Sequence, residues 1–251
     1  MLGVDWCAVL KRMIDIVVAS LALLLLTPLM LLIAALIVVD SPGPVLYRAE
    51  RVGRGGGRLR MLKFRKMHQG AAGAALTTCD DCRLTRVGAV LRCARLDELP
   101  QLWHVLRGEM SFVGPRPEDP AFVARWEREY AEILRVRPGL TGWTQVAFAD
   151  EARILGREDP VRRYVESILP QKVQLDRMYA AHPSPSADVR ILAATFRTVV
   201  LRHPIAVDRA TGTMTRRRRP AAALPPVPQP VAAAVEVADR TAVAEAPARA
   251  A

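Results

Sequence analysis

Two adjacent acids, Asp97 and Glu98, stand in the densest polar segment of the chain, "RCARLDELPQLWHVLRGEMSFVGPRPEDP". Carboxylates in the first turn of a helix are favoured by the helix dipole, so an isolated Asp-Glu pair would indicate little. Here Arg92 precedes the pair, and Arg116 follows on a Gly-Pro-Arg-Pro turn whose prolines stiffen the backbone. Because guanidinium groups bind phosphate oxygens well, the segment predicts a site for phosphate chemistry.

The residue types leave two roles open for the acids. Mg²⁺ takes one or two carboxylates and completes its shell with water and substrate oxygens, so Asp97 and Glu98 could hold it beside phosphate groups. Alternatively, one carboxylate could be a nucleophile that forms a covalent intermediate.

Two further segments favour phosphate binding. "MLKFRKM" places Lys63 and Arg65 on one face of an extended strand. "RVRPGLTGWTQ" sets Arg137 and Trp143 around glycine turns, where backbone amides can approach a ligand, although core packing is the preferred interpretation of the tryptophan. There is no Walker loop or dinucleotide fingerprint, so any nucleotide is expected to bind in another way.

An uncharged apolar run covers residues 16–39. As a straight helix it would reach about 36 Å, enough for a hydrocarbon core of about 30 Å. Pro28 interrupts it by removing a backbone N–H, and the Thr27 hydroxyl could bond a freed carbonyl. Basic residues flank both ends, which marks both as cytoplasmic. The pattern leaves open a kinked spanning helix and a re-entrant helix hinged at Thr27 and Pro28.

The chain has 36 Lys and Arg against 25 Asp and Glu, a net charge of +11 that favours anionic partners such as lipid headgroups, phosphorylated substrates or nucleic acid. A rival interpretation is therefore a membrane-anchored nucleic-acid-binding or regulatory protein without enzymatic activity. It is disfavoured because the basic residues are spread among Gly-Pro turns and lipid-facing flanks. The four cysteines, Cys7, Cys79, Cys82 and Cys93, lack the second pair that a zinc site needs.

The hydrophobic pattern predicts a mainly α fold with a small β-hairpin, in the α+β class. The hairpin is expected at residues 45–65, and helices at 99–108, 119–136, 159–181 and 186–203. We expect a membrane anchor at 1–44, a cytoplasmic helical catalytic domain at 45–204 and a disordered Ala/Pro-rich tail at 205–251, which cannot build a core. Residues 68–81 are expected to form a mobile loop.

Six motifs follow one another in a specific order. They are KRxxD (Lys11, Arg12 and Asp15), an apolar run broken at Pro28, DSPGPV (40–45), KFRKM (63–67), LDELPQLWHVLRGEMSFVGPRP (96–117) and RPGLTGW (137–143). Across about residues 10–204, the chain resembles the bacterial sugar transferases that are monotopic polyprenol-phosphate phosphoglycosyl transferases.

This resemblance implies transfer of a sugar 1-phosphate from a UDP-sugar to undecaprenyl phosphate, with release of UMP and Mg²⁺ as cofactor. The reaction would initiate an exopolysaccharide, capsule, O-antigen or glycoprotein glycan. The implied location is the bacterial inner (cytoplasmic) membrane, with the catalytic domain on the cytoplasmic face and residues 1–44 as a re-entrant membrane anchor hinged at Thr27 and Pro28. Membrane lipid is a further partner, nucleic acid is not expected, and a homodimer is left open.

The resemblance also implies residue roles. Asp97 matches the nucleophile, and Glu98 matches the second acid, which helps to bind Mg²⁺ or to activate the acceptor. The positions that match phosphate-binding groups are Lys63, Arg92 and Arg116. The loop implied to lie near the nucleotide comprises Arg137, Pro138, Gly139, Thr141, Gly142 and Trp143. Asp176 and Asp188 match acids of the C-terminal helices.

Three positions depart from the family pattern. Thr27 replaces the serine of a Ser-Pro hinge but keeps its hydroxyl. Arg95 stands where many members have a serine helix cap. After Trp143, "TQVAFADEARILGREDP" differs from small members and resembles a longer subgroup, so Arg153 is only a candidate for an expected arginine, and the sugar specificity is left open.

Overall fold

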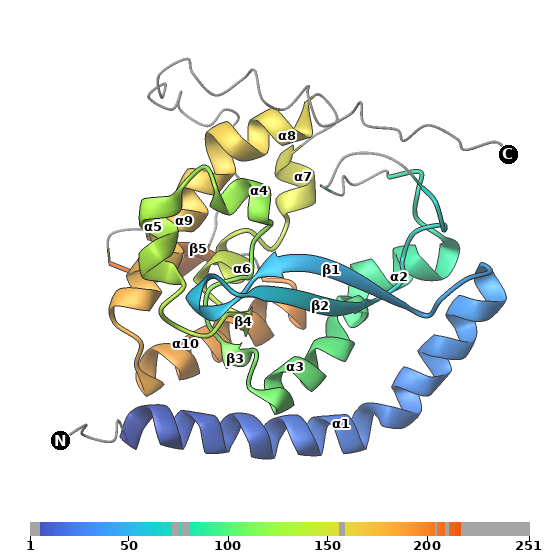
Figure 1. The fold of residues 1–251 in the computed structure, drawn as a ribbon, viewed down its shortest axis with the longest axis horizontal. Coiled ribbons are helices and arrows are strands. Elements are labelled where there is room, and N and C mark those ends of the chain that lie inside the picture. The colour runs from blue at the N-terminus through green and yellow to red at the C-terminus, as the bar shows by residue number, and fades with distance from the viewer. Residues whose placement is uncertain are drawn as a thin grey trace, which may run out of the picture. The chain divides into compact units, whose positions relative to one another are not determined.

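The computed structural model describes residues 6–71, 76, 81–155, 159–203, 205–208 and 211–216. Contacts divide the chain into a unit of residues 1–219 and a second of residues 220–251, which lies outside the described residues. Within the described ranges the first unit is mostly helical and contains three two-stranded sheets (Figure 1). The expected mainly α class with a small hairpin is confirmed.

The elements follow one another along the chain as shown in Figure 1. The α-helices are α1 (Trp6–Asp40), α2 (Arg86–Ala94), α3 (Leu102–Arg107), α4 (Pro120–Val123), α5 (Glu127–Ile133), α6 (Trp143–Ala147), α7 (Glu151–Leu155), α8 (Pro160–Arg163), α9 (Leu169–Ala181) and α10 (Pro185–Val199). Three other helical turns are the 3₁₀ turns η1 (Arg54–Gly56) and η2 (Leu96–Gln101) and the π turn η3 (Tyr164–Ile168). The strands are β1 (Leu46–Val52), β2 (Arg58–Phe64), β3 (Ser111–Val113), β4 (Gly139–Thr141), β5 (Ile205–Val207) and β6 (Met214–Arg216).

Helix α1 is long and apolar enough to cross a membrane, and it bends between its ends (Figure 1). Pro28 lies inside it and cannot donate to the preceding turn. The hydroxyl of Thr27 donates to the carbonyl of Leu23 at 2.6 Å. The Thr27 side chain thus satisfies a backbone carbonyl in the turn before the proline. Such side-chain hydrogen bonds allow a helix interrupted by proline to remain stable in a membrane.

The KRxxD motif fastens the first half of α1 to the rest of the unit. Lys11 pairs with Asp188 of α10 at 2.5 Å, and the guanidinium of Arg12 donates to the carbonyls that end α3, Val105 at 2.6 Å and Leu106 at 2.7 Å. Asp15 accepts the backbone N–H of Phe112 at 3.2 Å. These contacts join one turn of α1 to the segments around β3.

The second half of α1 returns to the same unit. Asp40 accepts the backbone N–H of Val87 in α2 at 2.9 Å, and Ile37 packs in a cluster with Phe64 of β2. Arg65, immediately after β2, is buried and donates to the carbonyls of Ile37 at 3.5 Å and Ser41 at 2.6 Å, and to that of Pro42. A cation at the carbonyl end of a helix complements its dipole. Both halves of α1 are therefore anchored to one body.

The predicted hairpin at 45–65 is confirmed. Strands β1 and β2 pair antiparallel through the register Leu46↔Phe64 to Val52↔Arg58. Alternate residues of β2 are buried, with Leu59 and Met61 packed against Val105 and Met110. The pairing leaves the C-terminal end of β2 beside η2, which carries the two acids.

A short parallel pair, β3 with β4, joins the Gly-Pro-Arg-Pro and Arg-Pro-Gly segments. Gly114 donates to the carbonyl of Thr141 at 2.9 Å, and Gly139 donates to that of Pro115 at 2.8 Å. A Cβ at Gly139 would lie 2.1 Å from the backbone nitrogen of Gly114. The glycines therefore permit two backbones to cross in contact.

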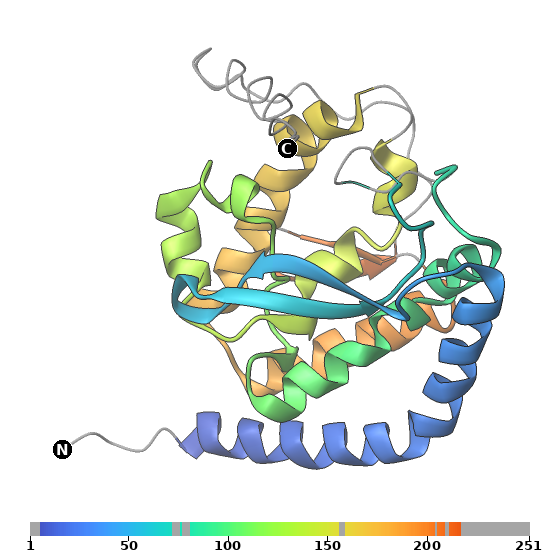
Figure 2. The same ribbon diagram turned by 45° about the vertical axis from the view of Figure 1, so that its right-hand side comes forward.

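The structure differs from the predicted boundaries in two places. The helix expected at 119–136 is two helices, α4 and α5, because Trp126 between them has φ −134° and ψ 42°. Strands also lie beyond the predicted domain boundary at residue 204. Strands β5 and β6 form an antiparallel hairpin at 205–216 that packs on α6 (Figure 2).

Some predictions fall on residues that the structure does not describe. Parts of the expected loop at 68–81, Cys79, and the tail beyond residue 216 lie outside the described residues. The side chains of Cys7 and Arg153 are also outside them.

Substitution of Gly139 by alanine should destabilise the fold, because the new Cβ would overlap the backbone of Gly114. Overpacking costs about 1–3 kcal/mol, and an overlap with backbone belongs at the upper end. The matched control is Gly57→Ala, whose Cβ would lie 3.6 Å from the carbonyl oxygen of Arg54, in ordinary van der Waals contact. Thermal unfolding in detergent should show a lower midpoint for Gly139→Ala than for the control. Equal midpoints would contradict the backbone crossing.

Candidate active site

The two acids lie on η2, directly after α2. Arg95 makes the junction with a left-handed φ of 57°, and its guanidinium donates to the carbonyl of Ala149 at 2.5 Å. With three residues per 3₁₀ turn, neighbouring side chains point about 120° apart. Asp97 and Glu98 therefore face different surroundings although they are adjacent, and Asp97 is buried.

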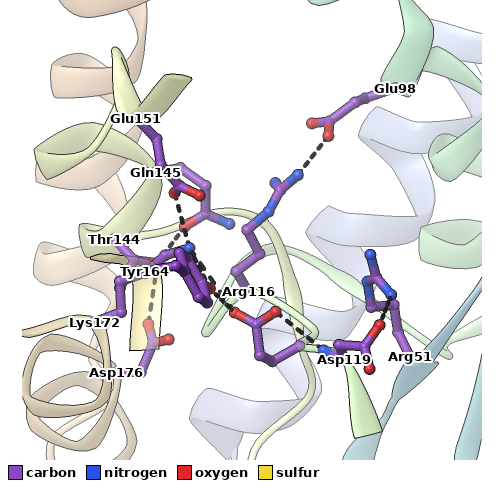
Figure 3. A network of polar contacts seen from close by, with 11 residues as sticks. Arg51, Glu98, Arg116, Asp119, Thr144, Gln145, Glu151, Tyr164, Lys172 and Asp176 are labelled. Atoms are coloured by element: carbon purple, nitrogen blue, oxygen red, sulfur yellow. Dashed lines mark hydrogen bonds and ion pairs between the residues drawn. The ribbon is translucent and has the colours of Figure 1, made fainter. Parts of the chain in front are cut away.

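Glu98 is held by two cations from different segments. Its Oε1 accepts from Lys63 of β2 at 2.9 Å and from Arg116 at 2.6 Å, the latter shown in Figure 3. Burial opposes its ionisation, but the charges of Arg116 and Lys63 outweigh burial and hold the pKa of Glu98 well below its usual range. The carboxylate of Glu98 in turn raises the pKa of Arg116. Burial lowers the pKa of Lys63 despite its pairing with Glu98.

Asp97 is held less tightly. In the described part of the chain its side chain pairs with Lys66 alone, at 3.4 Å from Oδ2. This distance is longer than an ordinary charge-assisted hydrogen bond. The Asp97 carboxylate thus lies beside the ammonium group of Lys66 and near the ion pairs of Glu98, but it makes no short ion pair of its own.

Lys66 is a site residue that the strand pattern does not find. Alternation predicts Lys63 and Arg65 on one face, but β2 ends at Phe64, so the alternation stops there. Lys63 and Lys66 both reach the acids, whereas Arg65 turns to the end of α1. The signal in the sequence was the cluster of three cations in "KFRK".

The other predicted site residues are distributed more widely. Arg92 lies in the last turn of α2, which leads into η2. Arg137 is partly buried, and its pKa is lowered by burial and by the charges of Arg54 and Arg12, so it lies toward α1. Trp143 is buried in a cluster with Val113, which agrees with the preferred core interpretation.

The remaining residues of the predicted nucleotide loop form or contact the parallel strand pair β3–β4. Pro138 accepts the backbone N–H of Ser111 at 2.9 Å, and the hydroxyl of Thr141 lies 2.6 Å from that of Thr195. A Cβ at Gly142 would lie 2.3 Å from the carbonyl oxygen of Gly114. The loop thereby supports the backbone that carries Arg116, and its role toward a nucleotide stays a prediction.

The two acids that follow Pro117 fix the turn that bears Arg116 (Figure 3). Glu118 accepts from the hydroxyl of Tyr164 at 2.5 Å, and Asp119 pairs with Arg51 of β1 at 2.9 Å. Buried Lys172 lies 2.9 Å from the same tyrosine oxygen and 3.8 Å from Glu118. The turn is therefore tied to both the hairpin and α9.

The π turn explains why Tyr164 and Lys172 meet. Eight positions along a regular α-helix leave two side chains about 80° apart. The π turn at Tyr164–Ile168 takes up one extra residue and reduces that angle to about 20°. Lys172 also pairs with Glu151 at 2.9 Å, so α7, in the segment that departs from small family members, is docked to the same network (Figure 3).

Asp176, one helical turn beyond Lys172, is buried and accepts from the hydroxyl of Thr144 at 3.2 Å. Burial raises its pKa to about 8, although the charge of Lys172 and the hydroxyl of Thr144 oppose that rise. The carboxyl is thus largely protonated at neutral pH. Asp188, the other predicted acid, pairs instead with Lys11.

Comparison with known proteins identifies the class to which this fold and site belong. Residues 6–202 match the family model for the bacterial sugar transferase family. The chain belongs to that family.

Three relatives illustrate its range. A UDP-N-acetylgalactosamine-undecaprenyl-phosphate N-acetylgalactosaminephosphotransferase from Aeromonas hydrophila is 42% identical over 203 residues, 77% of this chain and 44% of the relative. A UDP-glucose:undecaprenyl-phosphate glucose-1-phosphate transferase from Caulobacter vibrioides is 49% identical over 142 residues, 54% of this chain and 53% of the relative. The exopolysaccharide production protein PSS of Rhizobium leguminosarum bv. phaseoli is 38% identical over 196 residues, 74% of this chain and 93% of the relative. The chain thus spans about half the length of the first two.

Replacement of Asp176 by asparagine should be tolerated and should flatten the pH dependence of stability. The folded carboxyl keeps a proton that the unfolded chain releases above pH 3.8, so the free energy of unfolding falls as pH rises from there to about 8. One proton corresponds to about 1.4 kcal/mol per pH unit at most. Thermal midpoints in detergent at pH 5.5 and 7.5 should converge in Asp176→Asn.

The exposed Glu127, in the first turn of α5, provides the control for this measurement. Glu127→Gln should keep the parent's pH dependence. An Asp176→Asn variant that keeps the same slope would show that the buried carboxyl is ionised in the folded protein.

Proposed function

We propose that this protein transfers a sugar 1-phosphate from a UDP-sugar to undecaprenyl phosphate and releases UMP, through a covalent intermediate on Asp97. The observation that carries the proposal is the unequal pairing of two neighbouring acids: Glu98 is clamped by two cations, and Asp97 has one longer contact. The names of relatives that share 42% and 49% identity support undecaprenyl phosphate as acceptor.

The proposed reaction consists of two displacements at one phosphorus. A carboxylate oxygen of Asp97 bonds to the sugar-bearing phosphorus, and the bond from that phosphorus to the bridging oxygen breaks, so that UMP leaves with the electron pair. A phosphate oxygen of undecaprenyl phosphate then bonds to the same phosphorus, and Asp97 leaves as a carboxylate. A covalent intermediate lets a water-soluble donor and a lipid acceptor use the site in turn.

The residues around Asp97 have distinct roles in this scheme. Lys63 and Arg116 carry the positive charge that stabilises phosphate oxygens as the leaving group develops charge, and Arg92 adds to it. Glu98 holds those two cations in place through its Oε1 and so positions them. Lys66 pairs with Asp97 and orients its carboxylate.

The acids suit Mg²⁺ as the resemblance implies. Among the described residues no group of three or more His, Cys, Asp or Glu side chains gathers, so the protein would supply one or two carboxylates, from Asp97 and Glu98. This ligand set fits Mg²⁺, which completes its shell with water and substrate phosphate oxygens. When bound, the ion would neutralise diphosphate charge.

The proposed location is the inner membrane, with the catalytic domain on the cytoplasmic face and α1 as a re-entrant helix. Lys11 and Asp40 bracket the apolar run, yet both contact the same folded unit. A helix that crossed the bilayer would place them on opposite sides. The proposed partners are a UDP-sugar, undecaprenyl phosphate and membrane lipid.

Replacement of Asp97 by asparagine should abolish both transfer and the covalent intermediate, because an amide is a poor nucleophile at phosphorus. Intact-protein mass spectrometry after incubation with a UDP-sugar panel and no acceptor should show a phosphosugar adduct in the parent and none in Asp97→Asn. Glu98→Gln, which keeps shape but loses charge, should form the adduct more slowly by about 10²-fold or more, by analogy with removal of one electrostatic contact. An adduct that survives in Asp97→Asn would refute the nucleophile assignment.

The re-entrant topology predicts that both flanks of α1 face the cytoplasm. Single cysteines Gly3→Cys and Arg58→Cys, in a background with the four native cysteines replaced by serine, should both be shielded from a membrane-impermeant maleimide in intact cells. Permeabilised cells, the control, should label both. Labelling of one position in intact cells would instead establish a spanning helix.

A further inference from the structure

A groove with a volume of about 350 Å³ lies between α10 and the β5–β6 hairpin. Figure 2 shows these elements beside one another, on the part of the unit that carries α6. The size is within the range of pockets for small ligands, about 300–1,000 Å³. It is separate from the acids: neither Asp97 nor Glu98 lines it.

The lining of the groove combines basic groups with small and apolar ones. Arg190, Arg197 and His203 line it together with the hydroxyl-bearing Thr215, and no acidic residue is among the described residues that do so. Arg190 and Arg197 are seven positions apart, which places them on one face of α10. Ala193 lies between them and leaves room for a ligand.

The three basic groups differ in how far they are already engaged. Arg190 stacks over the ring of Trp143 at 5.9 Å and donates to the carbonyl of Gly212 at 3.5 Å, so it is held against the core. In the part of the chain that the structure describes, the side chains of Arg197 and His203 form no hydrogen bond or ion pair. The groove therefore contains two donors with unused capacity and one that is fixed.

A reversal of the chain directly after α10 forms the groove. Arg202 has a left-handed φ of 54°, and the N–H of His203 then donates back to the carbonyl of Arg197 at 3.0 Å. This reversal brings His203 over α10 and starts β5. Ile205 packs with Val146 and fixes the strand against α6. Because the hairpin lies beyond the family match at 6–202, the groove depends on an extension of this chain.

We propose that this groove binds a phosphate ester, with Arg197, His203 and Thr215 as donors and Arg190 as a fixed positive charge. Arginine matches phosphate oxygens with two parallel N–H groups, and the absence of acids from the described lining leaves the positive potential uncompensated. The apolar lining residues Ile205 and Met214 would contact the carbon portion of the ligand.

Phosphate esters could reach the groove from two sources. Phe196, next to Arg197, and Val200, one turn after Phe196, are exposed apolar residues on α10, so a phospholipid headgroup could enter with its acyl chains along that helix. A soluble phosphomonoester needs no such surface. The same donors would serve either source.

The test uses the full chain in detergent and the variant Arg197→Gln/His203→Gln. Native mass spectrometry would count retained phosphatidylglycerol against phosphatidylcholine, and calorimetric titration would measure binding of glycerol 3-phosphate. The matched control is Arg128→Gln, on the exposed face of α5, which removes the same positive charge elsewhere. Arg190 is left intact because it contacts Trp143.

Selective retention of phosphatidylglycerol that falls about tenfold in the double variant but not in Arg128→Gln would identify a lipid headgroup site, since loss of charge-assisted bonds costs about that factor. Glycerol 3-phosphate binding with the same pattern of loss would identify a soluble ligand. Unchanged binding of both probes in the double variant, or equal losses in the control, would overturn the proposal. Thermal unfolding midpoints equal to the parent's would show that the variants are folded.

Discussion

A partly buried carboxylate held by two cations connects three segments that are far apart in the sequence. Glu98 on η2 accepts from Lys63 on β2 and from Arg116 on the Gly-Pro-Arg-Pro turn. Removal of Glu98 would leave two partly buried cations without their shared counter-charge, which is destabilising. The hairpin, the 3₁₀ turn and the proline turn therefore keep their relative positions, and the rest of the site is arranged around them.

Three cationic side chains at the end of β2 contact three different groups. Lys63 binds Glu98, Arg65 binds the carbonyls at the end of α1, and Lys66 pairs with Asp97. Four consecutive residues thus link the membrane helix to both acids. A second support comes from Lys172 and Tyr164, which hold Glu118 two positions after Arg116. The groups proposed to bind phosphate are thus held in place by contacts with other residues of the protein.

The sequence contained strong signals for part of this arrangement. The apolar run of α1, the alternation in β1 and β2, and the pairing of acids with Arg116 in one segment all predicted what the structure shows. The parallel pair β3–β4 could not be found in this way, since strands of three residues carry no periodicity. Lys66 was missed because alternation fails where a strand ends. The β5–β6 hairpin was missed because its apolar residues lie next to a long Ala/Pro-rich tail.

The double attachment of α1 has a mechanical consequence. Membrane helices usually adapt to bilayer thickness by tilting. Here Arg12 and Asp15 fix one half of α1 to the catalytic unit, and Asp40 and Arg65 fix the other. Neither half can tilt without moving the body that carries the acids. In the proposed re-entrant topology, changes in lipid thickness would therefore be transmitted to the height of the acids above the bilayer, and with it to the reach of the proposed lipid-borne phosphate.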